Sequence, residues 1–349
     1  MIDRIKKLID QKEAKNIDGY IILNPLNVAY YINTKLEGTL LINKSEAVFL
    51  TDSRYIEEAK KTVSIKCIDV VIDKTYLDFF KISKAVGFEE SFVTIKGYED
   101  ILKEYKINKL VKANNIIEQA RIVKEPYEID CIKRACSVTD SCYSFLKKYI
   151  KQGVTEKEIE AEIQKFFMLN ADTVAFESIV ASGKNSSMPH ALVTTRKIEN
   201  IDYITIDFGA KINGYCADMT RTIAPLNVPL EYIDIYNKVL KIQLECIAKI
   251  KPGVSVKELS DFANNQMKKL GYKMPHALGH GVGLNIHERP YISSMSKDIL
   301  QENMCITVEP GIYIENKFGV RIEDTVLVTK NGCEVLTKSE KNIFKMLDI

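Results

Sequence analysis

The sequence is poor in features that mark several large classes of protein. Its 349 residues include no tryptophan, only four histidines, and no apolar run of the roughly 18 residues that a membrane span requires. A net charge of +2, from 49 Lys and Arg against 47 Asp and Glu, gives no support for a nucleic-acid partner. Hydrophobic residues make up 46% of the chain, which excludes intrinsic disorder. We therefore expect a folded protein with neither a nucleic-acid nor a membrane partner.

The cysteines do not form a recognisable metal motif. Eight are present, but none belongs to the C-x-x-C pair that is typical of zinc ribbons. An even number permits disulfides, yet the chain is large and begins with a charged segment, Met1–Lys7, rather than a signal peptide. Free, mostly buried thiols in a reducing compartment are therefore the favoured interpretation, and the sequence predicts a cytoplasmic protein.

The patterns along the chain divide it into two parts, as its length suggests. The first part alternates helix and strand signals, and the second opens with a long helical stretch from about Glu125 to Gln152, ended by Gly153. We predict an α/β domain at 1–122 and a second domain at 123–349. The elements expected in the first domain are a helix at 1–15, a strand at 19–23, paired strands at 39–42 and 47–50, a helix at 53–61 and a strand at 65–71.

A weak internal repeat runs through the second domain at an offset of 100 residues. The segment Lys151–Ile159 matches Lys251–Leu259 at five of nine positions, and each copy indicates a helix, a Gly-Val-Thr/Ser turn and another helix. Helix connections can converge on such residues without a duplication, but the residues after each copy favour a true repeat. The first copy is followed by His190, Asp207 and Asp218, and the second by His287, Glu309 and Glu323. The sequence thus predicts two similar α+β halves that face one another across a cleft.

The first acidic pair, Asp207 and Asp218, lies in two strand-like runs joined by a hairpin signal. A turn at Ile212–Asn213 would set the two acids opposite each other. A turn at Asn213–Gly214 would set them on a diagonal unless a bulge restored the pairing. Either turn leaves both on one sheet face, where like charges destabilise the sheet unless a cation neutralises them. Two exposed acids on a polar face are the alternative, but the apolar neighbours of Asp207 favour burial.

The second acidic pair, Glu309 and Glu323, repeats this arrangement. A loop of odd length centred near Asn316 would set the two glutamates against each other. Arg321 would point to the same side as Glu323, where it could pair with a carboxylate or contact a substrate. All four histidines lie between positions 190 and 287, and the glycines beside His280 predict close approach of the backbone to a cofactor or substrate.

These residue types together indicate a metal site. Two Asp, two Glu and one or two His form a mixed oxygen and nitrogen donor set that suits Mn²⁺, Co²⁺, Fe²⁺ or Zn²⁺. Because four carboxylates would concentrate negative charge in one pocket, two divalent ions balance it better than one. Such a pair of ions can activate water and polarise a carbonyl oxygen. The residues therefore predict hydrolysis of an amide or ester, with further histidines available for proton transfer.

The same motifs resemble those of the pita-bread metallopeptidases, which include methionine aminopeptidases, aminopeptidases P and prolidases, over about residues 125–349. The resemblance implies an α+β pita-bread (creatinase/aminopeptidase) fold with duplicated halves. It also implies two divalent ions, with Mn²⁺ expected first and Co²⁺, Zn²⁺ or Fe²⁺ as alternatives. Asp207 would bind one ion, Asp218 and Glu323 would bridge, and the remaining ligands would complete the other ion. The implied ligands are Asp207, Asp218, His280, Glu309 and Glu323.

Within this family the chain is similar to the proline-directed branch. Its first 122 residues resemble the creatinase-like α/β N-terminal domain of prolidases and aminopeptidases P, through positions 18–20 and 27–31. The resemblance implies a homodimer and hydrolysis of the Xaa-Pro bond, in dipeptides or at the N-terminus of longer peptides. The implied substrate-binding residues are His190, His276, His287 and Arg321, and the implied catalytic residues are His190, His287 and Glu309.

The implied reaction is attack of a metal-activated water on the scissile carbonyl. Glu309 would act as the base, His287 would stabilise the oxyanion, and His190 would assist at the leaving nitrogen. Two other functions stay open on the same fold: a catalytically inert peptide-binding protein and a metal-free creatinase-type hydrolase. The complete set of ligand residues disfavours both.

The chain also departs from the family pattern at two places. Asn285 stands where an aspartate is common, and Tyr291 stands where prolidases that grip a dipeptide carboxylate often carry arginine, although Arg289 is near. The second departure favours longer Xaa-Pro peptides over dipeptides and leaves the choice between the two open.

Overall fold

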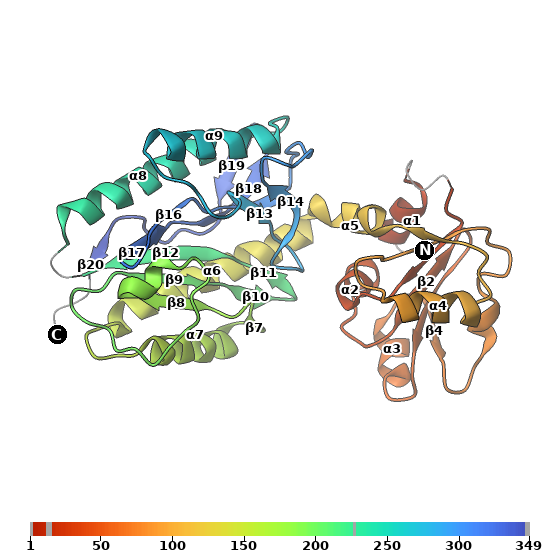
Figure 1. Ribbon diagram of the computed structural model, residues 1–349. Coiled ribbons are helices and arrows are strands. Elements are labelled where there is room, and N and C mark those ends of the chain that lie inside the picture. The colour runs from red at the N-terminus through yellow and green to blue at the C-terminus, as the bar shows by residue number, and fades with distance from the viewer. Residues whose placement is uncertain (1–2, 12–15, 226–227, 346–349) are drawn as a thin grey trace. The chain divides into compact units, whose positions relative to one another are not determined.

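The structure is a computed structural model that describes residues 3–11, 16–225 and 228–345, with the side chains of 344 and 345 left out. It divides into two compact units, Met1–Arg121 and Ile122–Ile349. Figure 1 shows strands surrounded by helices in each unit. No helix among the described residues is both long enough and apolar enough to cross a bilayer.

The N-terminal unit is built on a six-stranded mixed sheet with the order β4-β3-β2-β1-β5-β6. Strands β1, β3 and β5 are buried along their whole length, so the sheet has no solvent-facing side in its middle. The strands are β1 (Gly19–Ile22), β2 (Thr39–Asn43), β3 (Ala47–Thr51), β4 (Lys66–Asp69), β5 (Val86–Phe88) and β6 (Leu110–Lys112). The helices are α1 (Asp3–Ile9), α2 (Pro25–Ile32), α3 (Ile56–Thr62), the short 3-10 helix η2 (Thr75–Asp78), α4 (Ile95–Glu104) and α5 (Asn114–Ile122).

Most elements predicted for this unit are confirmed, with shifted ends. The paired strands are present, and Ile42 lies opposite Ala47 across their turn. The first helix is shorter than expected, because α1 ends at Ile9, and positions 12–15 of the predicted helix lie outside the described residues. The helix predicted from position 53 begins only at Ile56, because the Asp52 carboxylate first accepts the Arg54 amide in a turn.

The C-terminal unit consists of two halves of similar design, each with two helices and its own strands. Figure 1 shows α7 along one outer side of this unit, α8 and α9 along the opposite side, and strands between them. The first half contains α6 (Pro126–Tyr149), α7 (Glu156–Asn170), β7 (Thr173–Val174), β8 (Ile179–Ser182), the 3-10 helix η3 (Gly183–Ser187), β9 (Ile204–Phe208), β10 (Ala210–Ile212), β11 (Tyr215–Cys216) and β12 (Met219–Ala224). The second contains α8 (Leu230–Ile247), α9 (Val256–Lys269), β13 (Gly279–Gly281), β14 (Glu288–Ile292), β15 (Cys305–Val308), β16 (Gly311–Ile314), β17 (Phe318–Arg321), β18 (Asp324–Thr329) and β19 (Gly332–Val335), and β20 (Phe344–Lys345) then pairs with β12.

The predicted repeat corresponds to a helix–turn–helix connection that occurs in both halves with the same turn geometry. Gly153 and Gly253 have positive φ angles of 88° and 87°, which is why glycine is needed at both positions. Each turn then bonds to a strand-like segment in the same way: Gly153 N donates to Ile198 O and Gly253 N to Leu300 O, both at 2.8 Å. Thr155 and Ser255 then cap the next helix, each accepting the amide three residues on. Two separate cores lie behind these turns, one in each half.

The hairpin of the first half follows the Asn213–Gly214 alternative. Both turn residues have positive φ angles, and Lys211 lies opposite Cys216. The same register continues in β9 and β12, where Asp207 lies opposite Thr220. Asp207 and Asp218 are therefore diagonal neighbours rather than directly opposed.

The hairpin of the second half has the predicted loop. Asn316 has a φ angle of 56° at the loop centre, and Ile314 lies opposite Phe318. The register of β15 with β18, where Val308 lies opposite Asp324, is the same. This common register sets Glu309 against Glu323, as predicted.

Both hairpins are less continuous than the sequence suggested. Each crosses from one sheet to another, so the expected long strands are broken at 209, at 217–218, at 309–310 and at 322–323. Gly209 lies at one break, where the backbone passes so close to Ala217 that a Cβ would come within 1.9 Å of Ala217 O. This close approach requires glycine. Pro310 lies at another break, where it has no amide to donate to a ladder. Three of the predicted metal ligands, Asp218, Glu309 and Glu323, are at these breaks rather than within a strand.

Candidate metal centre

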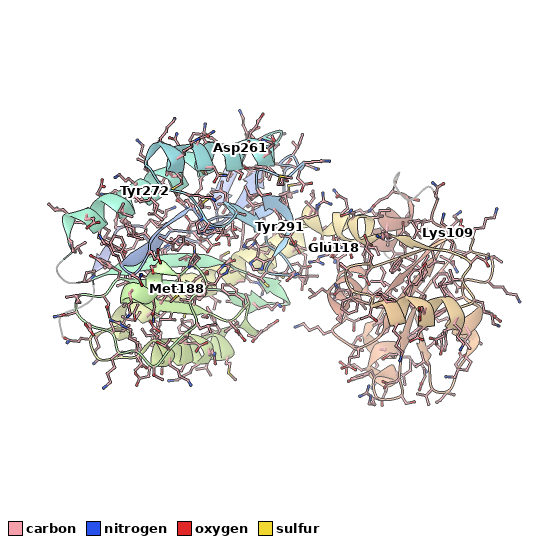
Figure 2. All side chains as sticks on the ribbon, viewed as in Figure 1. Lys109, Glu118, Met188, Asp261, Tyr272 and Tyr291 are labelled. Atoms are coloured by element: carbon pink, nitrogen blue, oxygen red, sulfur yellow. The ribbon has the colours of Figure 1, made fainter. Side chains whose placement is uncertain are left out.

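All nine residues singled out by the sequence line one cavity of about 280 Å³ in the C-terminal unit. The first half and the second half both contribute to its walls. The nine residues are His190, Asp207, Asp218, His276, His280, His287, Glu309, Arg321 and Glu323. Tyr291, labelled in Figure 2, lines the same cavity from β14 and is 51% exposed. The two halves therefore form one shared site.

The tightest part of the cavity is a group of three residues from both halves. Asp218, His280 and Glu323 are all buried, and each offers one ligand atom within 4.8 Å of the others. His280 Nε2 lies 3.5 Å from Asp218 Oδ2 and also 3.5 Å from Glu309 Oε1. Asp207 and Glu309 line the same cavity outside this closest group.

Asp207 is held from the opposite half. Its Oδ2 accepts a hydrogen bond of 2.7 Å from Arg321 Nη2. The Arg321 guanidinium also donates to Thr220 Oγ1, to Pro189 O and to the Tyr313 hydroxyl. Arg321 thus pairs with a carboxylate, which was the first of the two alternatives that the sequence left open.

Three carboxylates in this cavity, those of Asp218, Glu309 and Glu323, resist ionisation. Burial, reinforced by the charges of Glu323 and Asp207, raises the pKa of Asp218 well above its usual range. Burial likewise raises the pKa of Glu323 and brings that of Glu309 to about 8. The protein has therefore gathered acids that repel one another in a site from which water is largely removed.

The positions of unpaired oxygens indicate what would relieve this repulsion. Asp207 Oδ1, Asp218 Oδ1 and Glu323 Oε1 are buried and accept no hydrogen bond from the part of the chain that the structure describes. Buried oxygens without partners are costly unless a cation meets them. The opposite oxygens of Asp207 and Glu323 are bonded, to Arg321 and to Thr220 Oγ1, which fixes the direction of the unpaired ones. The donor set therefore fits divalent metal ions.

His280 is suited to be a ligand through Nε2. Its Nδ1 lies 3.0 Å from Gly281 O, so the N–H of the neutral ring points at that carbonyl and leaves a lone pair on Nε2. Burial and the neighbouring His287 lower the pKa of His280 to about 4, so the ring is neutral at neutral pH.

The glycines around His280 have a different role from the one expected. A Cβ at Gly279 would lie 2.1 Å from Thr307 O, and one at Gly281 would lie 2.3 Å from Arg289 O. These glycines admit neighbouring strands of the protein, rather than a cofactor or substrate. They allow β13 to sit between β14 and β15 and so bring His280 to the cavity.

The other three histidines surround the acidic group. His190 and His287 are exposed, and the His287 ring packs edge-on against His280 at 4.4 Å between centroids. His276 is half-buried, with Nδ1 2.8 Å from Ala277 O and Nε2 3.0 Å from the Tyr313 hydroxyl. Burial lowers the pKa of His276 to about 4 and also lowers that of His287.

Several supporting residues were missed by the sequence analysis. Thr220 donates to Glu323, Thr325 accepts the Asp218 amide, and Thr307 accepts the His280 amide. Tyr313 joins Arg321 to His276. The threonines precede or follow ligands in β-rich segments, where threonine is common for packing alone, so no pattern in the sequence distinguished them.

Comparison with known proteins agrees with this geometry. Residues 130–330 match metallopeptidase family M24, and residues 4–123 match the creatinase/prolidase N-terminal domain. A Xaa-Pro dipeptidase of Pyrococcus horikoshii is 36% identical over 98% of this chain and 99% of its own length. Among solved structures, a Xaa-Pro dipeptidase from Bacillus anthracis has a TM-score of 0.94 at 34% identity, covering 98% of this chain and 99% of its own. An X-Pro aminopeptidase from Thermotoga maritima has a TM-score of 0.89 at 33% identity, covering 98% of this chain and 100% of its own.

These likenesses extend over nearly the whole chain and confirm the predicted α+β pita-bread fold with its creatinase-like N-terminal domain. The cavity with its carboxylates and imidazoles lies inside the matched region. The protein therefore belongs to metallopeptidase family M24.

Proposed function

We propose that this metallopeptidase hydrolyses Xaa-Pro bonds, in dipeptides or at the N-terminus of short peptides. The observation that carries the proposal is the convergence of four carboxylates and His280 from the two halves, with three buried oxygens left without partners among the described residues. Two relatives at 34% and 36% identity, which match 98% of this chain, are Xaa-Pro dipeptidases, and this supports the choice of proline-containing substrates.

The proposed ligands of two divalent ions are those inferred from the sequence. Asp207, Asp218, His280, Glu309 and Glu323 would hold the ions, with Asp218 and Glu323 shared between them. Bound ions would polarise the scissile carbonyl and make water a better nucleophile. We propose Mn²⁺ as the working metal, with Co²⁺, Zn²⁺ or Fe²⁺ as alternatives, since all accept mixed carboxylate and imidazole ligands.

Three side chains of the cavity, Glu309, His287 and His190, are proposed to act on protons or on the developing charge. The Glu309 carboxylate, which lines the cavity beside His280, is proposed to accept a proton from the attacking water. We propose that His287 donates a hydrogen bond to the oxyanion and that His190 assists protonation of the proline nitrogen. That nitrogen must be protonated when the bond breaks, because an Xaa-Pro bond carries no N–H.

The other two cavity residues, Arg321 and His276, are given roles in holding a ligand and the substrate. Arg321 donates to Asp207 and lines the cavity, and we propose that it orients this ligand and contacts the substrate. His276 is linked to Arg321 through Tyr313 and is proposed to bind the substrate.

The proposal is tested by supplying Ala-Pro, Ala-Pro-Ala and Met-Ala to chelator-treated protein with Mn²⁺ or Co²⁺ added back. Cleavage of the dipeptide alone indicates a dipeptidase, and preference for the tripeptide indicates an aminopeptidase. Preference for Met-Ala contradicts proline specificity, and absence of both bound metal and turnover contradicts the function itself.

We also propose that the protein acts in the cytoplasm as a homodimer. The eight cysteines are thiols rather than disulfides, and six of them are buried, which suits a reducing compartment. Light scattering on the purified chain tests the oligomeric state.

A further inference from the structure

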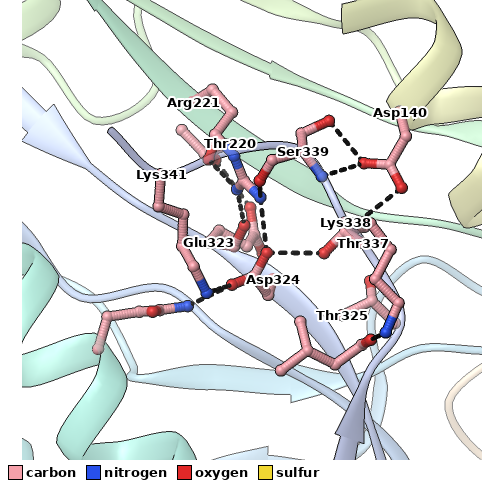
Figure 3. Close-up of polar contacts among 12 residues, drawn as sticks. Asp140, Thr220, Arg221, Glu323, Asp324, Thr325, Thr337, Lys338, Ser339 and Lys341 are labelled. Atoms are coloured by element: carbon pink, nitrogen blue, oxygen red, sulfur yellow. Dashed lines mark hydrogen bonds and ion pairs between the residues drawn. The ribbon is translucent and has the colours of Figure 1, made fainter. Parts of the chain in front are cut away.

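A network of buried charges lies behind the metal ligands, on the side of β12 and β18 that faces away from the cavity. Arg221 and Asp324 each follow a residue of the site, namely Thr220 and Glu323. Because side chains alternate along a strand, both point away from the cavity. Their side chains are 1% and 0% exposed and form an ion pair of 2.7 Å. The site thus rests on a second layer of charged groups (Figure 3).

Arg221 links this layer directly to the backbone of the acidic residues. Its Nη1 donates to Thr220 O and to Glu323 O, so one guanidinium spans the two strands. Its Nη2 donates to Asp324 Oδ1 and, at 2.8 Å, to Ser339 O. Arg221 thus joins the backbone carbonyls of Thr220 and Glu323.

The segment Thr337–Lys341, which follows β19, supplies half of the side-chain partners of Asp324. The Asp324 carboxylate accepts four hydrogen bonds from side chains, and the donors are Arg221, Gln243, Thr337 and Lys341. Burial would raise the pKa of Asp324, but the charges of Arg221 and Lys341 outweigh it and keep that pKa low. Without the segment, a buried carboxylate would lose two of its donors.

The same segment is attached to both halves of the unit. Asp140 on α6, in the first half, accepts the amides of Lys338 and Ser339 at 2.7 Å each. Tyr236 on α8, in the second half, donates to Lys341 O at 3.0 Å. Figure 3 shows Asp140 and Asp324 on either side of this segment.

We propose that Thr337–Lys341, with Arg221 and Asp324, is a clamp that fixes β12 and β18, which begin directly after Asp218 and Glu323, in the geometry that binds metal. This inference rests on the proposed function for the metal itself, but the clamping of the strands can be measured without metal. Asp140, Arg221 and Asp324 are positioning residues, because none of them lines the cavity.

The test uses D140A in the full-length protein, because Asp140 contacts the segment and lies away from the ligands. The matched control is D18A, which removes a carboxylate that likewise accepts two backbone amides, those of Lys84 and Ala85, in the N-terminal unit. Two quantities are measured: amide hydrogen exchange of residues 218–224 and 320–326 in metal-free protein, and Mn²⁺ affinity from the paramagnetic resonance signal of free Mn²⁺.

We expect D140A to speed exchange in both strands by at least about tenfold and to weaken Mn²⁺ binding by about tenfold, while D18A changes neither. K341M, which removes one donor to Asp324, is the second variant if D140A does not fold, with the same expected direction. Exchange in these strands within twofold of the unmodified protein would overturn the clamp. If the unmodified protein binds no Mn²⁺ but exchange in D140A still rises, the clamp on the strands stands and the proposed metal function fails.

Discussion

At the scale of single residues, the carboxylates of the cavity are unusual because they are buried with oxygens that lack a described hydrogen-bond donor. Asp218 is 4% exposed and Glu323 is 1% exposed, and each has one oxygen without a described partner. Their repulsion is a cost to the folded chain that metal ions would remove. Three predictions concern individual residues of this site.

Asp218→Asn should abolish metal binding and lower kcat/KM for Ala-Pro by at least about a thousandfold, because an amide oxygen cannot neutralise a shared cation. Isothermal titration with Mn²⁺ and an assay in metal-replete buffer measure the two effects. Full hydrolysis by the variant would show that the site has been assigned wrongly.

Glu309 should make the metal-free protein less stable as the pH rises. Burial raises the pKa of Glu309 to about 8, against 4.5 for an ordinary glutamate, so the folded state holds this proton more tightly than the unfolded state. The resulting stability is fully present below pH 4.5 and is lost as the pH rises through about 8. Thermal unfolding of chelated protein should show the advantage of the unmodified chain over Glu309→Gln shrinking across this range. A difference that is flat with pH would contradict the burial of this group.

Tyr291 should help to decide between dipeptides and longer peptides. It lines the cavity, while the nearby Arg289 is paired with Asp298 at 2.5 Å. Tyr291→Arg adds a cation that can meet the carboxylate of a dipeptide, so the ratio of kcat/KM for Ala-Pro over Ala-Pro-Ala should rise about tenfold. Tyr291→Met is the neutral control, and an equal change in both variants would exclude a role for charge.

Among the elements, the two bent hairpins determine where the ligands lie. A Cβ at Gly209 would come within 1.9 Å of Ala217 O, so Gly209→Ala must open the bend beside Asp207 and Asp218. We expect it to destabilise the protein by about 2–4 kcal/mol in urea unfolding. Gly332→Ala in β19 is the control, because a Cβ there meets nothing within 4 Å. Equal stability of the two variants would show that the bend tolerates a side chain.

The hairpins also show how far the sequence determines the fold. The turn residues Asn213, Gly214 and Asn316 favour positive φ angles, and the loop around Asn316 made Glu309 face Glu323 predictable. The breaks in the strands were not predictable, because they depend on close approaches of the backbone, such as that of Gly209 to Ala217, which no local pattern encodes. For a similar reason no pattern indicated that Arg221 would support Glu323 from a strand 102 residues earlier.

For the molecule as a whole, the described residues form separate hydrophobic cores in the N-terminal unit and in the two halves of the C-terminal unit. Metal should therefore stabilise only the unit that binds it. In differential scanning calorimetry we expect two transitions. Mn²⁺ should raise the midpoint temperature of one transition and change that of the other by no more than about 1 °C. An equal rise in the midpoint temperature of both transitions would indicate that the two units unfold together.

All four histidines of the sequence line the one cavity, and this has a practical consequence for spectroscopy. Every histidine imidazole signal in a nuclear magnetic resonance spectrum of this protein therefore comes from the site, and no mutation is needed to assign a signal to the site. Titration with a diamagnetic ion such as Zn²⁺ should shift the His280 resonances first, since its Nε2 lies among the carboxylates. A bound peptide should then shift those of His190, His276 and His287, so that metal loading and substrate binding are read separately in one spectrum.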